Sequence, residues 1–346
     1  MNTHTTPGKT DTGPLAKAAR LGAVGDAARR TIVSPDHPTP DRPRAEEAPA
    51  PRLELFHFVM SICSQKSRAA LFEAGQGFAS NELVIMPPLA ENYHPDYVAL
   101  RLASPLAASA TMVSSYSGAT GTEGEGFDPL VVPTLVDHEL GAVIADSRLI
   151  ALHADTLSGG RLIPDAHRAI VMAEVERVDG LPMAGLFYGP NPDGDHRPAP
   201  IQAGMKDAHL RKIEQIRARR DALEDDSPLR LAYEHKLLKE EAGRQFVHDP
   251  ASMKGIIADT AGAIAALDAV LNARPGDWIA GDDFTLADVF WGVSLFRLLY
   301  LGYGWMWADR PAVAGFADAA FARPSIRAGA IDWPGHPPGE TIAHLV

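Results

Sequence analysis

The one cysteine of this 346-residue chain, Cys63, follows a short apolar run and precedes a segment of helical composition. A thiol in the first turn of a helix faces unpaired backbone N–H groups and the positive end of the helix dipole. Both favour the thiolate, the form that attacks electrophiles and exchanges with disulfides. Lys66 and Arg68 add positive charge one turn further on. We therefore expect a reactive Cys63 with the hydroxyl of Ser64 beside it; the alternative is a buried, inert cysteine.

Pro133 stands near the start of a second apolar run, Val131–Asp137. A proline at the start of a strand suits a turn or a cis peptide bond. A cis bond would turn the backbone N–H and C=O of Val132 outward, where they could pair with an extended peptide ligand. The alternative is an edge-strand proline that binds nothing.

Asp146 and Ser147 combine a carboxylate, a hydroxyl and the free N–H groups of an expected helix start. Such a terminus suits a carboxylate ligand, and Asp146 could take an ammonium group. Together they would hold the α-amino acid end of a ligand, although helix capping alone would select the same residues. Cys63 with Ser64, Val132 with Pro133, and this pair therefore suit the sulfur, backbone and amino acid end of one thiol tripeptide.

The elements that must position these residues read as β-α-β, a linker, then β-β-α. We expect this thioredoxin-like domain over residues 53–158, with a four-stranded mixed sheet and a Ser-, Ala-, Thr- and Gly-rich insertion at 104–128. Its expected elements are the strands Leu53–Phe58 and Asn81–Met86, the helix Ser64–Ala74, the hairpin strands Val131–Asp137 and Ala142–Asp146, and a helix from Asp146 to about Leu157.

The second half has weak strand signals and strong helical periodicity, so we predict an all-α domain over residues 163–332. Residues Pro182–Pro200 read as a loop rich in Gly, Pro and Asp. The ends are expected to be tails: residues 1–52 are poor in large apolar side chains and read as flexible, and residues 333–346 follow the last helix. The predicted helices are 165–179, 205–223, 228–247, 250–274, 286–301, 311–321 and 325–331.

Composition limits the function classes. The net charge of -12 disfavours nucleic acid and anionic membranes as partners. One cysteine permits no disulfide within the chain, which suits a reducing cytoplasm. We find no secretory leader, no membrane-spanning run, no His spacing typical of a metal site, and no flavin or nicotinamide motif.

The combined pattern resembles the glutathione transferase family. The motifs that carry the resemblance are Val132-Pro-Thr-Leu135, Ala145-Asp-Ser147, and the segment Trp278–Asp288 in the helical half, where Thr285 and Asp288 form a capping box and Phe284 a hydrophobic staple. The segments Ser61–Arg68 and Glu91–Val98 further resemble the glutathione-dependent reductive dehalogenases of chlorinated hydroquinones. The resemblance covers about residues 53–331.

This resemblance implies a glutathione transferase fold with glutathione as co-substrate and a small aromatic substrate. Glutathione would place its γ-glutamyl end on Asp146 and Ser147 and its backbone on Val132 beside Pro133, with Lys66 also among its contacts. Ser64 would lie near the glutathione sulfur. Cys63 would carry the second half of the reaction, in which a glutathionyl hydroquinone yields a Cys63–glutathione mixed disulfide. A homodimer is possible, and no metal, flavin or nicotinamide is expected.

Other functions remain open at this point. A β-aryl etherase or a conjugating transferase would need the glutathione thiolate but not Cys63. A thiol transferase would use Cys63 without halide chemistry, and a non-catalytic binding module would need neither. The aromatic residues of the helical half favour core packing over a pocket wall: Phe296, Tyr300, Tyr303, Trp305 and Trp307.

Overall fold

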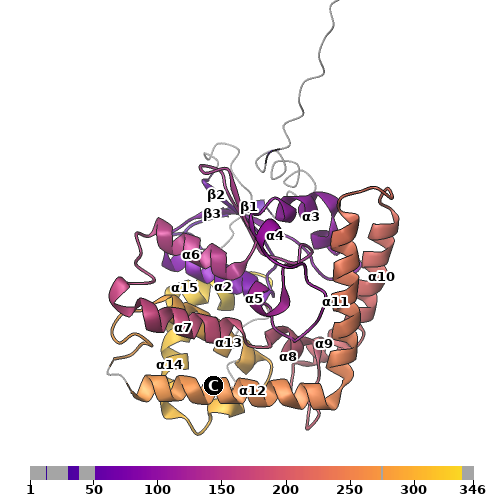
Figure 1. Cartoon of the computed structure of the whole chain (residues 1–346). Helices are drawn as coiled ribbons and strands as arrows, with labels where there is room; N and C mark the ends of the chain where they lie inside the picture. Colours follow the sequence, from indigo (N-terminus) through magenta and orange to yellow (C-terminus); the bar gives the residue numbers. More distant parts are fainter. Residues whose placement is uncertain (1–12, 14–29, 39–50, 274–275, 337–346) are drawn as a thin grey trace, which may run out of the picture.

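The computed structural model describes residues 13, 30–38, 51–273 and 276–336. A five-stranded mixed sheet, in the order β1-β3-β2-β4-β5, lies at the top of Figure 1. Its parallel pair, β2 and β3, confirms the expected βαβ unit, and the antiparallel hairpin of β4 and β5 confirms the ββα unit. The strand bounds are β1 Arg30–Val33, β2 Leu53–His57, β3 Phe78–Glu82, β4 Thr134–Asp137 and β5 Ala142–Ile144.

β1 corrects the prediction of a flexible tail over residues 1–52 and of a four-stranded sheet. It pairs antiparallel with β3, so that Arg30 lies opposite Asn81 and Val33 opposite Phe78. The guanidinium of Arg30 donates to Glu54 at 2.6 Å, and Val33 is buried. The strand has four residues, and its partner β3 lies far away in the sequence. The composition of the surrounding residues therefore did not predict a strand. The rest of the tail lies outside the described residues.

Helices cover both faces of the sheet. On one face α2, Ile62–Glu73, and α6, Ser147–Leu157, pack against each other and against β2 and β4. On the other face α3, Pro95–Leu102, places Tyr97 and Leu100 against Phe56 and Val136. A short 3-10 turn, η2 at Glu91–Tyr93, precedes α3. The site is therefore built where the strand ends meet the starts of α2 and α6.

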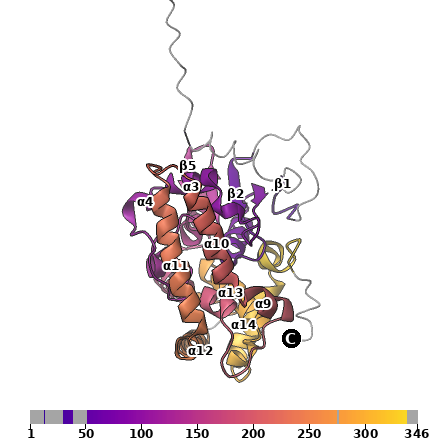
Figure 2. The ribbon, with the colours of Figure 1, turned by 90° about the vertical axis from the view of Figure 1, so that its right-hand side faces the viewer.

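The helical half confirms the all-α prediction and adds helices that the sequence did not reveal. Figure 2 shows α10 and α11 side by side beneath the sheet. The expected loop at 182–200 contains α8, so that part of the prediction is wrong. The bounds are η3 Asp165–His167, α7 Arg168–Asp179, α8 Met183–Tyr188, α9 Ala199–Met205, α10 Ala208–Asp221, α11 Arg230–His248, α12 Pro250–Asn272, α13 Leu286–Tyr300, η4 Gly304–Trp307, α14 Pro311–Ala322, α15 Pro324–Ile326 and η5 Arg327–Ile331.

α13 is buried along its whole length and carries the expected capping box. The Thr285 side chain accepts from the N3 backbone, and Asp288 accepts from the Thr285 N–H at 2.7 Å and the Thr285 hydroxyl at 2.6 Å. Asp288 also accepts from the Ile279 N–H at 2.9 Å. Phe284, the residue before the N-cap, packs edge-on against Trp278.

The insertion at 104–128 is an ordered bridge with two short helices, α4 Leu106–Ser109 and α5 Thr122–Glu125. The Gly118 carbonyl accepts from the N–H groups of Ala184 and Gly185 at 2.9 and 3.0 Å, which ties the insertion to α8. His235 of α11 lies 2.9 Å from the Val113 carbonyl. The insertion thus connects the sheet domain to the helices that face it.

Trp333 corrects the boundary of the expected C-terminal tail. Its ring is buried, stands edge-on to His57 and lies under the guanidinium of Arg68, with 4.4 Å from Cζ to the ring centroid. The segment after the last helix therefore packs against the sheet domain at Trp333 and against α13 at His336. Residues 337–346 lie outside the described part of the chain.

Within the described ranges, α12 is the one helix long and apolar enough by composition to cross a membrane. It packs against α8, α11 and α14 along the bottom of Figure 1. Its exposed face carries Lys254 and Asp259. We assign α12 to the helical domain on these contacts.

Candidate functional site

A cavity of about 290 Å³ lies between the sheet domain, the insertion and helices α8 to α11 and α13. Five of the seven residues expected at the site line it: Cys63, Val132, Pro133, Asp146 and Ser147. Ser64 and Lys66 do not. Segments far apart in the chain thus converge on one space, with Cys63 at the same cavity as Pro133 and Ser147.

Cys63 is the second residue of α2 and is half-buried. Burial raises the pKa of its thiol above the ordinary value. The Lys66 ammonium and the Ser147 side chain act in the opposite direction but do not outweigh burial. The expectation of a lowered pKa is therefore wrong, because a helix start that is enclosed by the insertion and the helical domain loses the solvation that a thiolate needs.

Lys66 is fully buried and points away from the cavity. Its Nζ lies 3.0 Å from Oδ1 of Asp179 in α7 and 4.8 Å from the centroid of Phe290 in α13. The predicted contact with glutathione is therefore corrected: Lys66 joins the two domains. It still acts on Cys63 through its charge.

Ser64 is also fully buried, and its hydroxyl accepts from the Phe58 N–H at 3.3 Å. The serine that lines the cavity is Ser61, the N-cap of α2. The Ser61 oxygen accepts from the Ser64 N–H at 3.3 Å, which leaves the hydroxyl proton of Ser61 for a donor role. The prediction placed Ser64 near the glutathione sulfur, whereas the structure places Ser61 at the cavity, because the helix begins two residues earlier than expected.

The Val132–Pro133 peptide bond is cis, as the sequence suggested. Buried Arg101 holds this turn: its guanidinium donates to the Pro133 carbonyl, to Thr134 Oγ1 at 3.0 Å and to the Ala145 carbonyl at 2.7 Å. One side chain thereby ties the cis turn to the residue before Asp146. No hydrogen bond joins the Val132 N–H to another residue of the described chain.

Asp146 and Ser147 form the start of α6. Asp146 Oδ1 accepts from the N–H groups of Arg148 and Leu149 at 2.9 and 3.1 Å, and Oδ2 accepts from the Thr122 hydroxyl at 2.9 Å. Asp146 therefore caps α6 and also anchors the insertion through Thr122. Ser147 is buried, and its side chain acts to lower the pKa of the Cys63 thiol.

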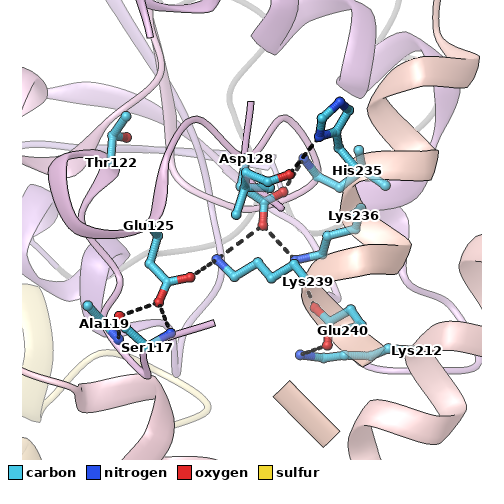
Figure 3. Close-up of polar contacts among 12 residues, drawn as sticks. Ser117, Ala119, Thr122, Glu125, Asp128, Lys212, His235, Lys236, Lys239 and Glu240 are labelled. Carbon is cyan, nitrogen blue, oxygen red and sulfur yellow. Dashed lines mark hydrogen bonds and ion pairs between the residues drawn. The ribbon is translucent and has the colours of Figure 1, made fainter. Parts of the chain in front are cut away.

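At the far end of the cavity lies a compact cluster of buried charges from α10, α11 and the insertion (Figure 3). We call this cluster the charged wall; Glu125 belongs to it through Lys239, and the other members line the cavity: Lys212, Lys236, Lys239, Asp128 and Glu240. Lys236 Nζ lies 2.7 Å from Asp128 and 2.8 Å from Glu240. Lys239 lies 3.3 Å from Glu125.

The charged wall keeps its groups ionised. Burial acts to raise the pKa of Asp128, but Lys236 and Lys239 outweigh it and hold that pKa at about 2. Burial likewise opposes the ionised form of Glu240, and Lys212 and Lys236 keep its pKa well below the ordinary value. The pKa of Lys236 is raised by Asp128 and Glu240 against burial.

Aromatic rings supply the apolar part of the lining: Phe58, Tyr93, Tyr116, Phe187 and Tyr188. None of the five aromatic residues considered earlier lines the cavity, and Phe296, Tyr300 and Tyr303 are buried in the core. From α13 only Arg297 reaches the cavity, where it donates to the Met60 carbonyl at 2.6 Å. Within the described ranges no group of three His, Cys, Asp or Glu side chains could hold a metal ion.

The residues at the cavity that sequence reasoning missed include Ser61, Tyr116 and the charged wall. In the sequence, the lysines of α11 and the acidic residues of the insertion each look like exposed surface charges. Only their proximity in the folded protein shows that they form a buried cluster. Their meeting depends on how the insertion folds over α11.

Comparison with known proteins finds similarity to the glutathione S-transferase C-terminal domain and to reductive dechlorinases. Residues 250–319 match the model of the glutathione S-transferase C-terminal domain. The chain is 48% identical over 342 residues to a 2,5-dichlorohydroquinone reductive dechlorinase of Sphingobium indicum, covering 97% of this chain and 98% of that protein. It is 25% identical to a tetrachloro-p-hydroquinone reductive dehalogenase of Sphingobium chlorophenolicum, over 82% of this chain and 99% of that one.

Among solved structures, the β-etherase LigF of Sphingobium sp. strain SYK-6 aligns with a TM-score of 0.54 at 18% identity, covering 80% of this chain and 98% of its own. At 18% identity this match supports the fold and nothing more specific.

Proposed function

This chain belongs to the glutathione transferase superfamily, and from its similarity to a 2,5-dichlorohydroquinone reductive dechlorinase we propose that it dechlorinates 2,5-dichlorohydroquinone or a close analogue with glutathione as reductant. The observation that supports the proposal most is the position of Cys63. Its thiol lines the same cavity as the cis Val132–Pro133 turn and Ser147. A tripeptide bound along that turn would bring its own sulfur to Cys63.

Glutathione would lie across the first turn of α2, the Val132–Pro133 turn and the start of α6. The Val132 backbone would pair with the cysteinyl backbone of glutathione. The γ-glutamyl carboxylate would lie at the N-terminus of α6 beside Ser147, where backbone N–H groups favour an anion. The carboxylate of Asp146, held by its capping bonds and by Thr122, would accept from the ammonium group.

In the first half of the reaction the Ser61 hydroxyl donates to the glutathione sulfur and favours the thiolate. The thiolate displaces chloride from the keto tautomer of the hydroquinone. The carbon–sulfur bond forms as the carbon–chlorine bond breaks, and the product is a glutathionyl adduct.

In the second half Cys63 attacks the sulfur of that adduct. The electron pair of the carbon–sulfur bond stays on the ring as an enolate, which takes up a proton, and a Cys63–glutathione disulfide remains. A second glutathione exchanges with this disulfide. Because the chain has one cysteine, the resolving thiol must come from outside it. The net change replaces C–Cl by C–H and joins two glutathiones in a disulfide.

Substitution of Cys63 by Ser tests the scheme. With a chlorohydroquinone and glutathione under anaerobic conditions, the variant should release chloride once per adduct and accumulate the glutathione conjugate. The wild type should release about one chloride per oxidised glutathione, as the exchange chemistry requires. Normal release of dechlorinated product by the variant would contradict the scheme. The homodimer and the cytoplasmic location stay predictions.

A further inference from the structure

His209, near the start of α10, lines the cavity beside the charged wall. Its side chain is 3% exposed, and Nδ1 lies 2.7 Å from Oε2 of Glu240. The other ring nitrogen, Nε2, is buried and has no hydrogen-bond partner among the described residues. A buried nitrogen without a partner is costly unless a ligand completes it.

Tyr116, from the insertion, presents a second such atom. Its hydroxyl is buried without a partner in the described chain, and its ring stands edge-on to His209 with centroids 5.5 Å apart. The ring of Tyr188 in α8 is tilted against the His209 ring, and the two ring centroids are 4.9 Å apart. This end of the cavity therefore offers two polar atoms among aromatic rings, which suits a flat ring that carries hydroxyl groups.

Gly243 of α11 makes room for this arrangement. A Cβ at that position would lie 2.7 Å from His209 Cε1 and 3.0 Å from Tyr116 Cδ2. Such contacts are too short for either ring to stay in place. The missing side chain of Gly243 therefore lets both rings lie against α11.

The tautomer of His209 follows from its partner. Lys236 and Lys212 lie 2.8 and 3.5 Å from Glu240, so this carboxylate stays ionised and can only accept a hydrogen bond. Nδ1 of His209 must then carry the proton. Burial lowers the pKa of His209 although Glu240 acts to raise it, so the ring is neutral near pH 7 and Nε2 has a free lone pair.

We propose that His209 is the catalytic base that tautomerises the hydroquinone, and this rests on the proposed function. Nε2 takes the proton of a ring hydroxyl, and the resulting imidazolium, paired with Glu240, gives that proton to the adjacent chlorine-bearing carbon. One O–H bond breaks, one C–H bond forms and the oxygen becomes a carbonyl; no electrons are gained or lost. The Tyr116 hydroxyl donates to the oxygen that becomes the carbonyl.

The test needs neither halide nor glutathione. Unsubstituted hydroquinone is incubated anaerobically with the full-length protein in D₂O, and exchange of its ring hydrogens is followed by proton NMR. Since ring exchange requires the keto tautomer, the wild type should accelerate it. His209→Gln should lower the enzyme-catalysed rate by about 100-fold or more, the range expected for a general base.

Two variants guard against a merely structural effect. Gly243→Ala keeps His209 but displaces it, and should also lose most of the exchange. His153→Gln, whose ring pairs with Asp137 outside the cavity, should exchange normally. Calorimetric binding of glutathione should be unchanged in His209→Gln, which would show that its fold is intact. Exchange by His209→Gln at the wild-type rate, or no acceleration by the wild type, would overturn the inference.

The same variants separate this inference from the proposed function. The wild type could exchange ring hydrogens but release no chloride from any chlorohydroquinone. That result would contradict the proposed function and support the role of His209 as a base. Full dechlorination by His209→Gln would contradict the base and leave the proposed function standing.

Discussion

The Lys66 ammonium lies 3.0 Å from the Asp179 carboxylate, and the two charges act on the Cys63 thiol with opposite signs. Lys66 favours the thiolate and Asp179 opposes it. The pair therefore joins α2 to α7 and also sets part of the electrostatic environment of the thiol.

We expect Asp179→Asn to lower the pKa of Cys63, because Lys66 then acts without its counter-ion. Lys66→Met should raise that pKa, because only the opposing carboxylate remains. The pH dependence of alkylation by iodoacetamide measures both, and the single cysteine makes the signal specific. Asp165→Asn, at an exposed carboxylate, serves as the control. Shifts of the same sign in both variants would contradict the assignment.

The two serines near Cys63 should respond differently to removal of their hydroxyls. Ser61→Ala should slow chloride release about tenfold or more, the effect of about one pKa unit on the glutathione thiol. Ser64→Ala should cost about 1 kcal/mol of unfolding free energy through the lost bond to Phe58 and leave kcat/KM nearly unchanged. Chloride assays and urea unfolding on both variants decide the matter. A catalytic loss confined to Ser64→Ala would restore the original assignment.

Asp128 should link stability to acid pH. Its pKa is about 2 in the folded protein against 3.8 ordinarily, so its contribution is present above 3.8 and lost as the pH falls through about 2. The difference corresponds to about 2 kcal/mol. Asp128→Asn should be less stable than the wild type near neutral pH, and this gap should narrow in acid. Urea unfolding from about pH 5 to pH 2.5 measures it, with Asp226→Asn as an exposed control. A gap that stays constant would exclude the linkage.

The capping box of α13 should matter for the whole helical domain. Asp288→Ala leaves the N–H groups of Ile279 and Thr285 buried without an acceptor, which should cost about 2 kcal/mol or more. Thermal and urea unfolding measure the loss. Asp318→Ala, at an exposed position of α14, should be close to neutral. Equal stabilities of the two variants would show that the box contributes little.

Features that depend on neighbouring residues were predictable from the sequence. Asp146 as the N-cap of α6, the cis bond before Pro133 and the capping box of Thr285 are each defined by a few adjacent residues. Hydrophobic periodicity likewise predicted α11 and α13 to within two residues at either end.

Features that depend on packing between distant segments were not predictable. Whether Ser61 or Ser64 faces the cavity depends on where α2 begins and how its first turn rotates. Lys66 looked like a ligand contact because nothing near it in sequence shows that Asp179 lies behind it. The environment of His209 needs Glu240 on another helix and Tyr116 from the insertion.

β1 has a consequence for how copies of this protein behave together. Without it, β3 would be an outer strand whose N–H and C=O groups could template the addition of a strand from another molecule. Pairing with Arg30–Val33 satisfies that row from within the same chain. β1 then forms the outer edge itself, and its length of four residues makes that edge a poor template for another chain.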